Sequence, residues 1–353
     1  MKKDSKIYVA GHRGLTGSAI VKNLRDKGYE NLVYRTHSEL DLTNQVAVRE
    51  FFEKEKPEYV FLSAAKVGGI SANNTYRADF IYQNLMIQNN VIHQSYLSKT
   101  KKLLFLGTTC IYPKESPQPI KEEYLLTSPL EYTNEPYAIA KIAGLKMCES
   151  YNLQYGTNFI SVMPTGIYGA DDNFDLENCH VLPALIRKMH LSKLLAQANY
   201  SMILKDLNLD SIEKAKEYCD RFGIRADGVE IWGSGNPRRE FLHSSDMADA
   251  CVFVMENIDF KDLCVGDTKE VRNTHINIGY GSDVSIKELA EMIGCIVGFG
   301  GKLFFDATKP DGTFRKLPDC SRLQSFGWKY KVALEQGVKM LYQWYLDVSV
   351  KRG

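Results

Sequence analysis

Short apolar runs alternate with amphipathic stretches along the first half of the chain. The apolar runs predict strands at Lys6–Ala10, Asn31–Tyr34, Tyr59–Ser63, Lys102–Gly107 and Asn158–Met163. Between them, apolar residues at helical spacing predict helices at Leu15–Lys27, Gln45–Glu55, Ala78–Leu97 and Tyr137–Tyr155. Short strands joined by helical crossovers are typical of a doubly wound parallel sheet, so the sequence predicts an α/β fold of Rossmann type.

The pattern changes after Tyr168. Helices are predicted at Val181–His190, through much of the charged stretch Leu191–Gly228, and at Ser244–Glu256, Ile286–Gly294 and Ala333–Tyr345. Strands are predicted at Val229–Trp232, Lys302–Asp306 and Thr274–Ile278, and we expect the last of these to rejoin the sheet. The expected organisation is a Rossmann domain of residues 1–170 and about 241–280, with a smaller α/β substrate-binding lobe of about 171–240 and 281–353.

Composition and charge narrow the class of protein. The 353 residues are 44% apolar and 25% charged, which excludes a disordered or fibrous chain. Lys and Arg (44) nearly balance Asp and Glu (43), so no nucleic-acid or membrane partner is expected. The first residues lead directly into a strand, without the pattern of a signal peptide. The eight cysteines lack metal-ligand spacing, so we expect reduced thiols, no metal and a cytoplasmic location.

A glycine-rich loop follows the first predicted strand and opens the first predicted helix. It comprises Gly11, His12, Arg13, Gly14, Leu15, Thr16 and Gly17. Glycines there permit a tight turn and bring backbone N–H groups close to a pyrophosphate at the positive end of a helix. A turn that needs glycine only for its shape is the alternative, but the position directly after strand one favours a dinucleotide site.

Arg35 ends the second predicted strand, where NAD-specific folds usually carry an acidic residue that binds the ribose 2′-hydroxyl. Together with Arg13 it presents two guanidiniums that can pair with a 2′-phosphate. The sequence therefore favours NADP over NAD. The alternative is a pair of solvated surface arginines.

Tyr137 and Lys141 lie four residues apart at the start of a predicted helix and so share one helix face. A neighbouring ammonium is expected to lower the pKa of the phenol and make it a proton donor near neutral pH. Thr108, at the end of the fourth predicted strand, offers a hydroxyl for a carbonyl oxygen. The three residues together predict carbonyl reduction, although Tyr-x-x-x-Lys alone also occurs on surface helices.

Cys110 and His180 form a second candidate pair, because a thiol and an imidazole can remove and return a proton across a sugar ring. Taken singly, each also fits a structural role, as a strand-end cysteine and a helix-capping histidine.

Seven stretches carry a family resemblance: Ala10–Gly14, Ala64–Gly69, Asn73–Tyr76, Cys110–Lys114, Asn134–Lys141, Arg239–His243 and Lys309–Gly312. The chain resembles the GDP-L-fucose synthases, extended short-chain dehydrogenase/reductases that epimerise and then reduce a GDP-4-keto-6-deoxy sugar. The resemblance implies NADP(H) as cofactor, a GDP-linked 4-keto sugar as substrate, and a homodimer formed through a four-helix bundle.

The same resemblance implies roles for individual residues. Tyr137 becomes the proton donor to the C4 oxygen, Lys141 its partner, and Thr108 stands at the position of the catalytic serine. Cys110 and His180 become the base and the acid of epimerisation. Cofactor contacts are implied for the glycine loop, Arg35, Leu106, Gly107, Thr108, Thr109, Lys141, Pro164, Thr165, Gly166, Ile167 and His180. Substrate contacts are implied for Arg187, Trp232, Arg239 and Asp311.

Three features depart from the family pattern. Thr108 replaces a serine and adds a methyl group beside the ketone. Gly166 stands where the family usually has asparagine, and the Leu191–Gly228 stretch is longer than the family norm. All three bear on sugar choice or epimerisation, whereas the Tyr–Lys pair is intact.

The leading hypothesis is NADPH-dependent C4 reduction of a GDP-4-keto sugar, preceded by C3/C5 epimerisation. The alternative is a pure C4 reductase that acts on another sugar such as a GDP-heptose. A nucleotide-sugar 4,6-dehydratase is disfavoured because Thr109 and Cys110 occupy the place of its Asp-Glu pair. A non-catalytic NADP-binding regulator is disfavoured by the intact Thr108, Tyr137 and Lys141 set.

Overall fold

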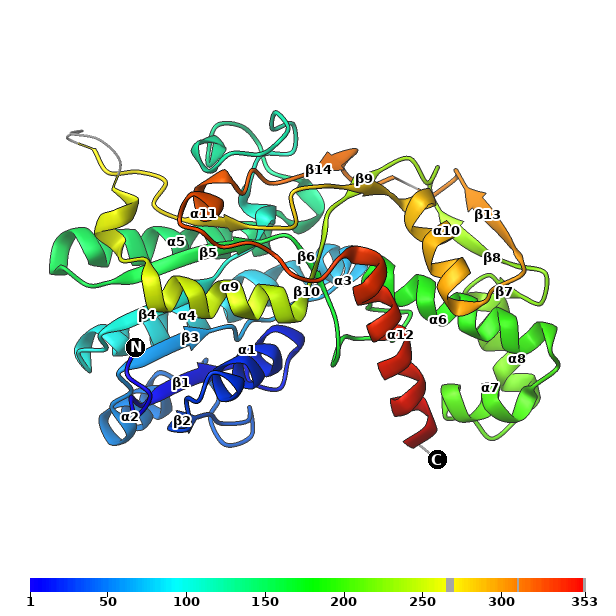
Figure 1. Ribbon diagram of the computed structural model, residues 1–353, viewed down its shortest axis with the longest axis horizontal. Helices are drawn as coiled ribbons and strands as arrows, with labels where there is room; N and C mark the ends of the chain where they lie inside the picture. Colours follow the sequence, from blue (N-terminus) through cyan, green and yellow to red (C-terminus); the bar gives the residue numbers. More distant parts are fainter. Residues whose placement is uncertain (265–269, 310, 352–353) are drawn as a thin grey trace. The chain divides into compact units, whose positions relative to one another are not determined.

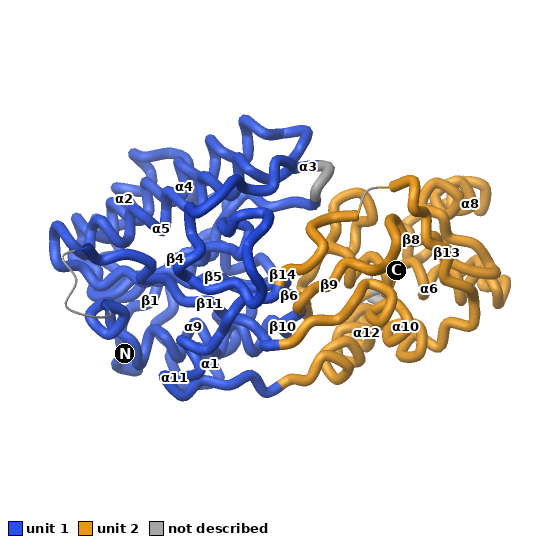
Figure 2. The backbone as a smooth tube through the Cα atoms, turned by 90° about the horizontal axis from the view of Figure 1, so that it is seen from above, with its two compact units in different colours: residues 1–167, 241–281, 317–331 blue, residues 168–240, 282–316, 332–353 orange. Residues whose placement is uncertain are grey.

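The computed structural model describes residues 1–264, 270–309 and 311–351, except the side chains of residues 70–71 and 349–351. The chain divides into two compact units (Figure 2). The first unit comprises residues 1–167, 241–281 and 317–331, and the second comprises residues 168–240, 282–316 and 332–353. Each unit is described separately below.

The first unit is built on a six-stranded parallel sheet, which confirms the predicted Rossmann-type α/β fold (Figure 1). Its strands, in spatial order, are β2 (Leu32–Val33), β1 (Ile7–Ala10), β3 (Tyr59–Leu62), β4 (Lys102–Leu106), β5 (Phe159–Pro164) and β11 (Ile276–Ile278). The last strand rejoins the sheet beside β5, as the sequence predicts. The chain order reverses between β1 and β3, and ligands of such sheets bind at the carboxyl ends of the strands near this switch point.

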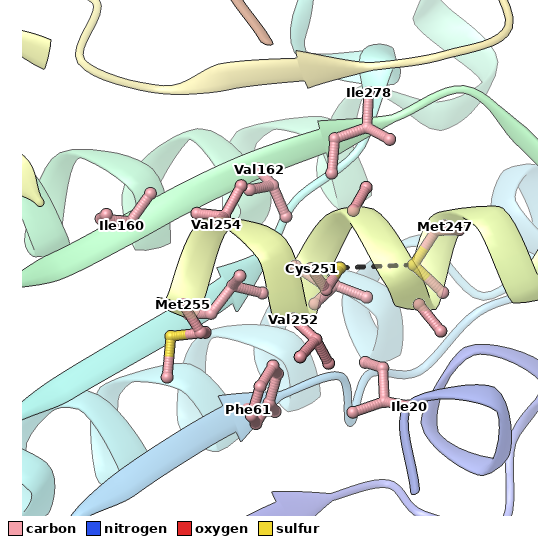
Figure 3. Close-up of a cluster of buried hydrophobic side chains, with 14 of the residues drawn as sticks. Ile20, Phe61, Ile160, Val162, Met247, Cys251, Val252, Val254, Met255 and Ile278 are labelled. Carbon is pink, nitrogen blue, oxygen red and sulfur yellow. Dashed lines mark hydrogen bonds between the residues drawn. The ribbon is translucent and has the colours of Figure 1, made fainter. Parts of the chain in front are cut away.

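Helices cover both faces of this sheet. One apolar cluster joins Ile7, Val9 and Phe61 to α1 (Leu15–Asp26) and α9 (Ser244–Asn257), and Figure 3 shows Cys251 and Val252 of α9 within it. A second cluster joins Tyr8 and the other face of the strands to α2 (Gln45–Glu55), α4 (Arg77–Leu97) and α5 (Glu135–Tyr155). Because alternate residues of β1 enter different clusters and all are buried, the strand appears in the sequence as a continuous apolar run.

Short elements complete the first unit: α3 (Ile70–Thr75), η1 (Thr109–Ile111), η2 (Glu122–Tyr124), η3 (Tyr132–Asn134), β6 (Gly166–Tyr168, whose last residue belongs to the second unit), β10 (Phe241–His243), η4 (Phe260–Leu263) and α11 (Ser321–Ser325). Residues 317–331, expected in the substrate lobe, belong to this unit instead. The cause is hydrogen bonding to distant segments of the first unit. The Ile120 and Asp319 N–H groups donate to the carbonyls of Leu317 and Ile120, and the Trp328 indole donates to Asp249.

The second unit contains the helices α6 (Val181–Ala196), α7 (Tyr200–Leu207), α8 (Ile212–Arg221), α10 (Ile286–Val297) and α12 (Leu334–Lys351). One sheet is formed by β7 (Ile224–Arg225), β8 (Gly228–Trp232) and β13 (Lys302–Asp306), and another by β9 (Arg238–Arg239), β12 (Val284–Ser285) and β14 (Arg315–Lys316). The charged stretch Leu191–Gly228 is mostly helical, as predicted, and supplies the end of α6 together with α7 and α8.

Within the described residues, no helix has the length and apolar character required to cross a membrane. No disulfide joins any of the eight cysteines, all of which lie in the described part of the chain. Burial raises the pKa of Cys148 and Cys179 to about 12, so these two thiols stay protonated at neutral pH.

Candidate active site

The glycine loop forms the turn between β1 and α1. Gly11 has a φ of +83°, and a Cβ there would lie 2.8 Å from the backbone of Ala64, two residues past the end of the neighbouring strand β3. A Cβ on Gly17 would lie 2.1 Å from the Gly11 carbonyl oxygen, so the first turn of α1 packs directly on the loop. Gly14 is the N-cap residue of α1, and no side chain caps the helix there. These features fit a pyrophosphate held by backbone N–H groups at the start of α1.

Arg13 and Arg35 approach the same corner beyond the ends of β1 and β2. Hydrogen bonds from Thr36 lower the pKa of the nearby Glu39 carboxyl most. Both guanidiniums lower this pKa further by their positive charge. The Arg35 guanidinium also donates to Glu55 (2.7 Å) and to the Tyr34 carbonyl (2.8 Å). A guanidinium has five N–H donors, so donors remain for a 2′-phosphate even though a carboxylate already binds Arg35.

Thr108 and Cys110 lie in one short turn at the carboxyl end of β4. The Thr108 Oγ1 atom accepts a hydrogen bond from the Cys110 backbone N–H at 3.2 Å. A hydroxyl has one proton and two acceptor lone pairs, so this contact orients the Thr108 side chain and leaves its proton available to a ketone oxygen.

Tyr137 lies in the first turn of α5, directly after Pro136, with its ring edge-on to Phe80 at 6.3 Å. Lys141, one turn later, is buried, and its Nζ donates to the Leu106 carbonyl at 2.8 Å. The Nζ lies 5.9 Å from the centroid of the Tyr137 ring. The structure thus places the phenol, the ammonium and the Thr108 hydroxyl around the end of β4, as the sequence predicts.

The expected lowering of the Tyr137 pKa is wrong. Burial raises the pKa of Tyr137, and the nearby Cys110 raises it further. Burial also lowers the pKa of Lys141 to about 7. The sequence indicates the shared helix face, but it does not show that both groups lose water or that the Leu106 carbonyl takes the ammonium. Tyr137 therefore keeps its proton at neutral pH, as a general acid must.

Other predicted residues of the first unit lie at the same edge of the sheet. Pro164 ends β5, and the Thr165 N–H donates to the Ile278 carbonyl at 2.9 Å. Gly166 is exposed and Ile167 partly exposed. Leu106, Gly107 and Thr109 are buried around the turn that carries Thr108.

His180 lies in the second unit, immediately before α6. It keeps solvent contact, but surrounding protein lowers its pKa through desolvation, so the imidazole is neutral at pH 7.

The predicted substrate contacts of the second unit fall into two groups. Trp232 is 65% exposed, and the Lys309 ammonium lies 5.5 Å from the centroid of its ring. Asp311 accepts hydrogen bonds from the Ser234 backbone and hydroxyl (2.9 and 2.7 Å), and Arg239 lies beside Gly312. The exposed Trp232 indole can stack on a base, and the Arg239 guanidinium and the Asp311 carboxylate can form hydrogen bonds. Together these groups suit a nucleotide.

Arg187 is different, because its side chain is only 12% exposed and donates to Asp206 and Phe174. No motif in the sequence marks the neighbouring Lys188. Its Nζ donates to the Glu230 carbonyl (2.6 Å) on β8, the strand that ends at Trp232, and burial lowers its pKa. Successive helix residues point in directions about 100° apart, so only one of two adjacent cations can face β8. The basic pair is visible in the sequence, but the direction of each side chain is not.

Comparisons with known proteins agree with this geometry. The profile of the NAD dependent epimerase/dehydratase family matches residues 7–279. The chain belongs to this family. It is 54% identical to the putative GDP-L-fucose synthase 2 of Arabidopsis thaliana over 352 residues, which cover 100% of this chain and 95% of the relative. The resemblance to the GDP-L-fucose synthases is therefore confirmed.

Two solved structures are as similar in sequence. A GDP-6-OMe-4-keto-L-xylo-heptose reductase from C. jejuni is 54% identical, with a TM-score of 0.95, over 99% of both chains. The GDP-mannoheptose C4 reductase MlghC from Campylobacter jejuni, solved with NADP bound, is 53% identical, with a TM-score of 0.88, over 98% of this chain and 99% of that one.

In this member of the epimerase/dehydratase family, we expect Lys141→Met to stabilise the cofactor-free protein. The native ammonium is buried against one carbonyl, and its removal should raise the free energy of unfolding by ~1–3 kcal/mol at pH 6. Between pH 7 and 10.5 the unfolded native chain holds the Lys141 proton more tightly than the folded chain. The native protein therefore gains stability as pH rises, and the advantage of the variant shrinks.

Urea unfolding at pH 6 and pH 10 tests this prediction. Lys22→Met, at an exposed lysine of α1 paired with Asp26, is the matched control and should change little at either pH. An advantage of Lys141→Met that is equal at both pH values would show that Lys141 titrates normally.

Proposed function

We propose that this protein reduces the C4 ketone of a GDP-linked sugar with NADPH, after inverting C3 and C5 of the same sugar. The observation that carries the proposal is the grouping of Thr108, Tyr137 and Lys141 at the carboxyl end of β4. The Thr108 proton is available, the Tyr137 proton is retained at neutral pH, and Lys141 is buried beside them. This arrangement suits a ketone oxygen that becomes an alcohol.

In the reduction, NADPH, when bound, supplies the hydride to C4. Thr108 donates a hydrogen bond to the ketone oxygen and holds it next to Tyr137. Tyr137 gives its proton to that oxygen as negative charge develops there. The resulting phenolate lies in the first turn of α5, where the helix dipole and the Lys141 ammonium stabilise it.

Epimerisation uses the same ketone before it is reduced, because a C4 carbonyl acidifies the hydrogens on C3 and C5. Cys110 follows Thr108 by two residues and lies close enough to Tyr137 to raise the pKa of that phenol. We assign Cys110 as the base that removes the carbon-bound proton and His180 as the acid that returns one to the opposite face. Because the His180 imidazole is neutral at pH 7, it takes up a proton before it donates one to the sugar. The residues that we assign as contacts to the GDP part of the substrate are Arg239, Trp232, Asp311 and Lys188. Arg187 is not assigned as a substrate contact.

NADPH is assigned as the reductant because two arginines meet at the corner beyond β1 and β2. We expect Arg35→Ala to raise the KM for NADPH and to reduce the preference for NADPH over NADH by about 10-fold. This is the effect expected when one charge-assisted hydrogen bond to the 2′-phosphate is lost. The KM values for both cofactors measure this. Arg49→Ala, on the exposed face of α2, is the control and should leave the ratio unchanged. An unchanged ratio in Arg35→Ala would remove the basis for the assignment.

A pure C4 reductase that acts on a GDP-heptose is the second candidate. Gly166 and Thr108 favour it, since both depart from the family pattern and Gly166 is exposed. The two solved relatives above are GDP-heptose reductases by name, and they match this chain about as well as the Arabidopsis relative does.

Product analysis in deuterated water tests both candidates. The protein is incubated with NADPH and either a GDP-4-keto-6-deoxyhexose or a GDP-4-keto-heptose, and the products are analysed by NMR. Deuterium at C3 and C5 together with reduction supports the leading proposal, and reduction without deuterium supports the second candidate. If neither sugar is reduced, both are wrong.

The cytoplasmic location and the homodimer remain proposals. Support for the dimer comes from exposed apolar side chains on α4 and α5, two long helices of the first unit: Tyr82, Leu97, Ile139, Leu153 and Tyr155. Sedimentation at the mass of one chain would contradict the dimer.

A further inference from the structure

A buried ion pair in the second unit joins the long Leu191–Gly228 stretch to helix α6. The Arg187 and Asp206 side chains are 12% and 4% exposed. Arg187 Nε donates to the Asp206 carboxylate and Nη2 to the Asp206 backbone carbonyl, both at 3.1 Å. The Tyr345 hydroxyl of α12 donates to the other oxygen of the carboxylate. Asp206 lies in α7, so this part of the long stretch supplies the buried counterion for Arg187.

The third contact of Arg187 reaches the segment that leads to His180. Arg187 Nη1 donates to the Phe174 carbonyl at 3.0 Å. The Phe174 side chain is buried, and its ring lies 4.6 Å from that of Tyr345. From there the chain makes a tight turn, in which the N–H groups of Asn178 and Cys179 donate to the Asp175 carbonyl at 3.0 and 2.8 Å. His180 follows this turn directly and begins α6.

We propose that Arg187 and Asp206 are positioning residues: through Phe174 they hold the Phe174–Cys179 turn and so place His180. The proposal rests on the proposed function, in which His180 returns a proton to the sugar. It also gives the long stretch a role, because α7 carries the carboxylate that keeps the Arg187 charge in the interior. The geometry makes Arg187 a structural link, since its donors on three sides are occupied by protein groups.

The choice of variants follows from the burial of the pair. Removing one charge leaves the other buried and unpaired, which would unfold part of the unit, whereas replacing both with apolar side chains of similar size is often neutral. The test variant is the double substitution Arg187→Met with Asp206→Asn, which removes both charges, keeps a side-chain oxygen to accept the Tyr345 hydrogen bond, and deletes the bond to Phe174. Arg187→Lys is a second variant, because it keeps the charge pair but lacks the planar fork needed to reach Asp206 and Phe174 together.

Arg221→Gln is the matched control. Arg221 also pairs with the same turn, through Glu177, but both side chains are exposed, so the loss of that pair should have little effect. Hydrogen–deuterium exchange of the full chain is followed by mass spectrometry. We expect peptides covering residues 174–180 to exchange about fivefold faster in the double variant, the change expected for one lost hydrogen bond. Peptides of α5 in the double variant should exchange at the native rate. In Arg221→Gln, the peptides covering residues 174–180 should also exchange at the native rate.

The chemical reactivity of His180 gives a readout that does not depend on activity. Diethyl pyrocarbonate modifies neutral imidazoles, and the rate at His180 is read from the mass of its peptide at pH 7. We expect a faster rate in both Arg187 variants and a native rate in Arg221→Gln. Unchanged exchange in residues 174–180 would overturn the proposal, and so would faster exchange with unchanged reactivity of His180.

Activity separates this proposal from the proposed function. If the native protein incorporates deuterium at C3 or C5, the double variant should incorporate less while NADPH oxidation continues. Incorporation at the native rate, despite a loosened turn, would overturn the placement of His180 by Arg187. If the native protein incorporates none, the epimerisation half of the proposed function fails, and the exchange and reactivity measurements alone decide the placement.

Discussion

Tyr137→Phe is expected to lower the turnover number for ketone reduction by ~10²–10⁴-fold, the contribution of a general acid. The substitution keeps the ring, and with it the edge-on contact to Phe80, so folding and NADPH binding should be preserved. Only the proton that moves to the C4 oxygen is lost. Stopped-flow measurement of NADPH oxidation gives the rate, and NADPH fluorescence gives the affinity.

The matched control is Tyr132→Phe, in the 3-10 turn just before α5, because Tyr132 is 68% exposed and plays no part in the proposed chemistry. It should reduce the ketone at the native rate. Reduction at the native rate by Tyr137→Phe would show that another group donates the proton, and the assigned mechanism would then be wrong.

Cys110→Ser is expected to separate epimerisation from reduction. A serine hydroxyl has a much higher pKa than a thiol, so deuterium incorporation at C3 and C5 should fall by ~10²–10⁴-fold. Thr108, Tyr137 and Lys141 are untouched, so NADPH oxidation should continue and give a product that is reduced without inversion. The Thr108 contact should survive as well, because it uses the backbone N–H of residue 110.

Cys295→Ser, at an exposed cysteine of α10, is the control for this experiment and should leave both rates unchanged. Two outcomes count against the assignment. A native protein that incorporates no deuterium is a plain C4 reductase. A Cys110→Ser protein that exchanges deuterium but no longer oxidises NADPH would show that the assigned roles are reversed.

The fold could be predicted from the sequence because its signals are local. Strands β1, β3, β4 and β5 are buried on both faces and appear as apolar runs, and helices such as α2 show the 3.6-residue period. Short elements such as β6, β9 and β14 have no such signal, because two or three residues acquire their pairing only from distant partners.

The sequence by itself determined which residues the proposed chemistry uses. The spacing of Tyr137 and Lys141 on one helix, and the positions of Gly11, Thr108 and Cys110 after their strands, follow from periodicity and chain order alone. Parallel strands bring their carboxyl ends to one edge of a sheet, so side chains that follow those strands meet without further information.

Only the tertiary structure decided how charged groups are solvated and what they bind. Lys141 loses most of its water and donates to Leu106, Arg35 shares its guanidinium with Glu55, and Arg187 turns inward to Asp206. A pKa or an ion pair depends on the atoms within a few ångströms, and here they come from segments 19 to 35 residues away along the chain. No local pattern records which of those segments will be neighbours.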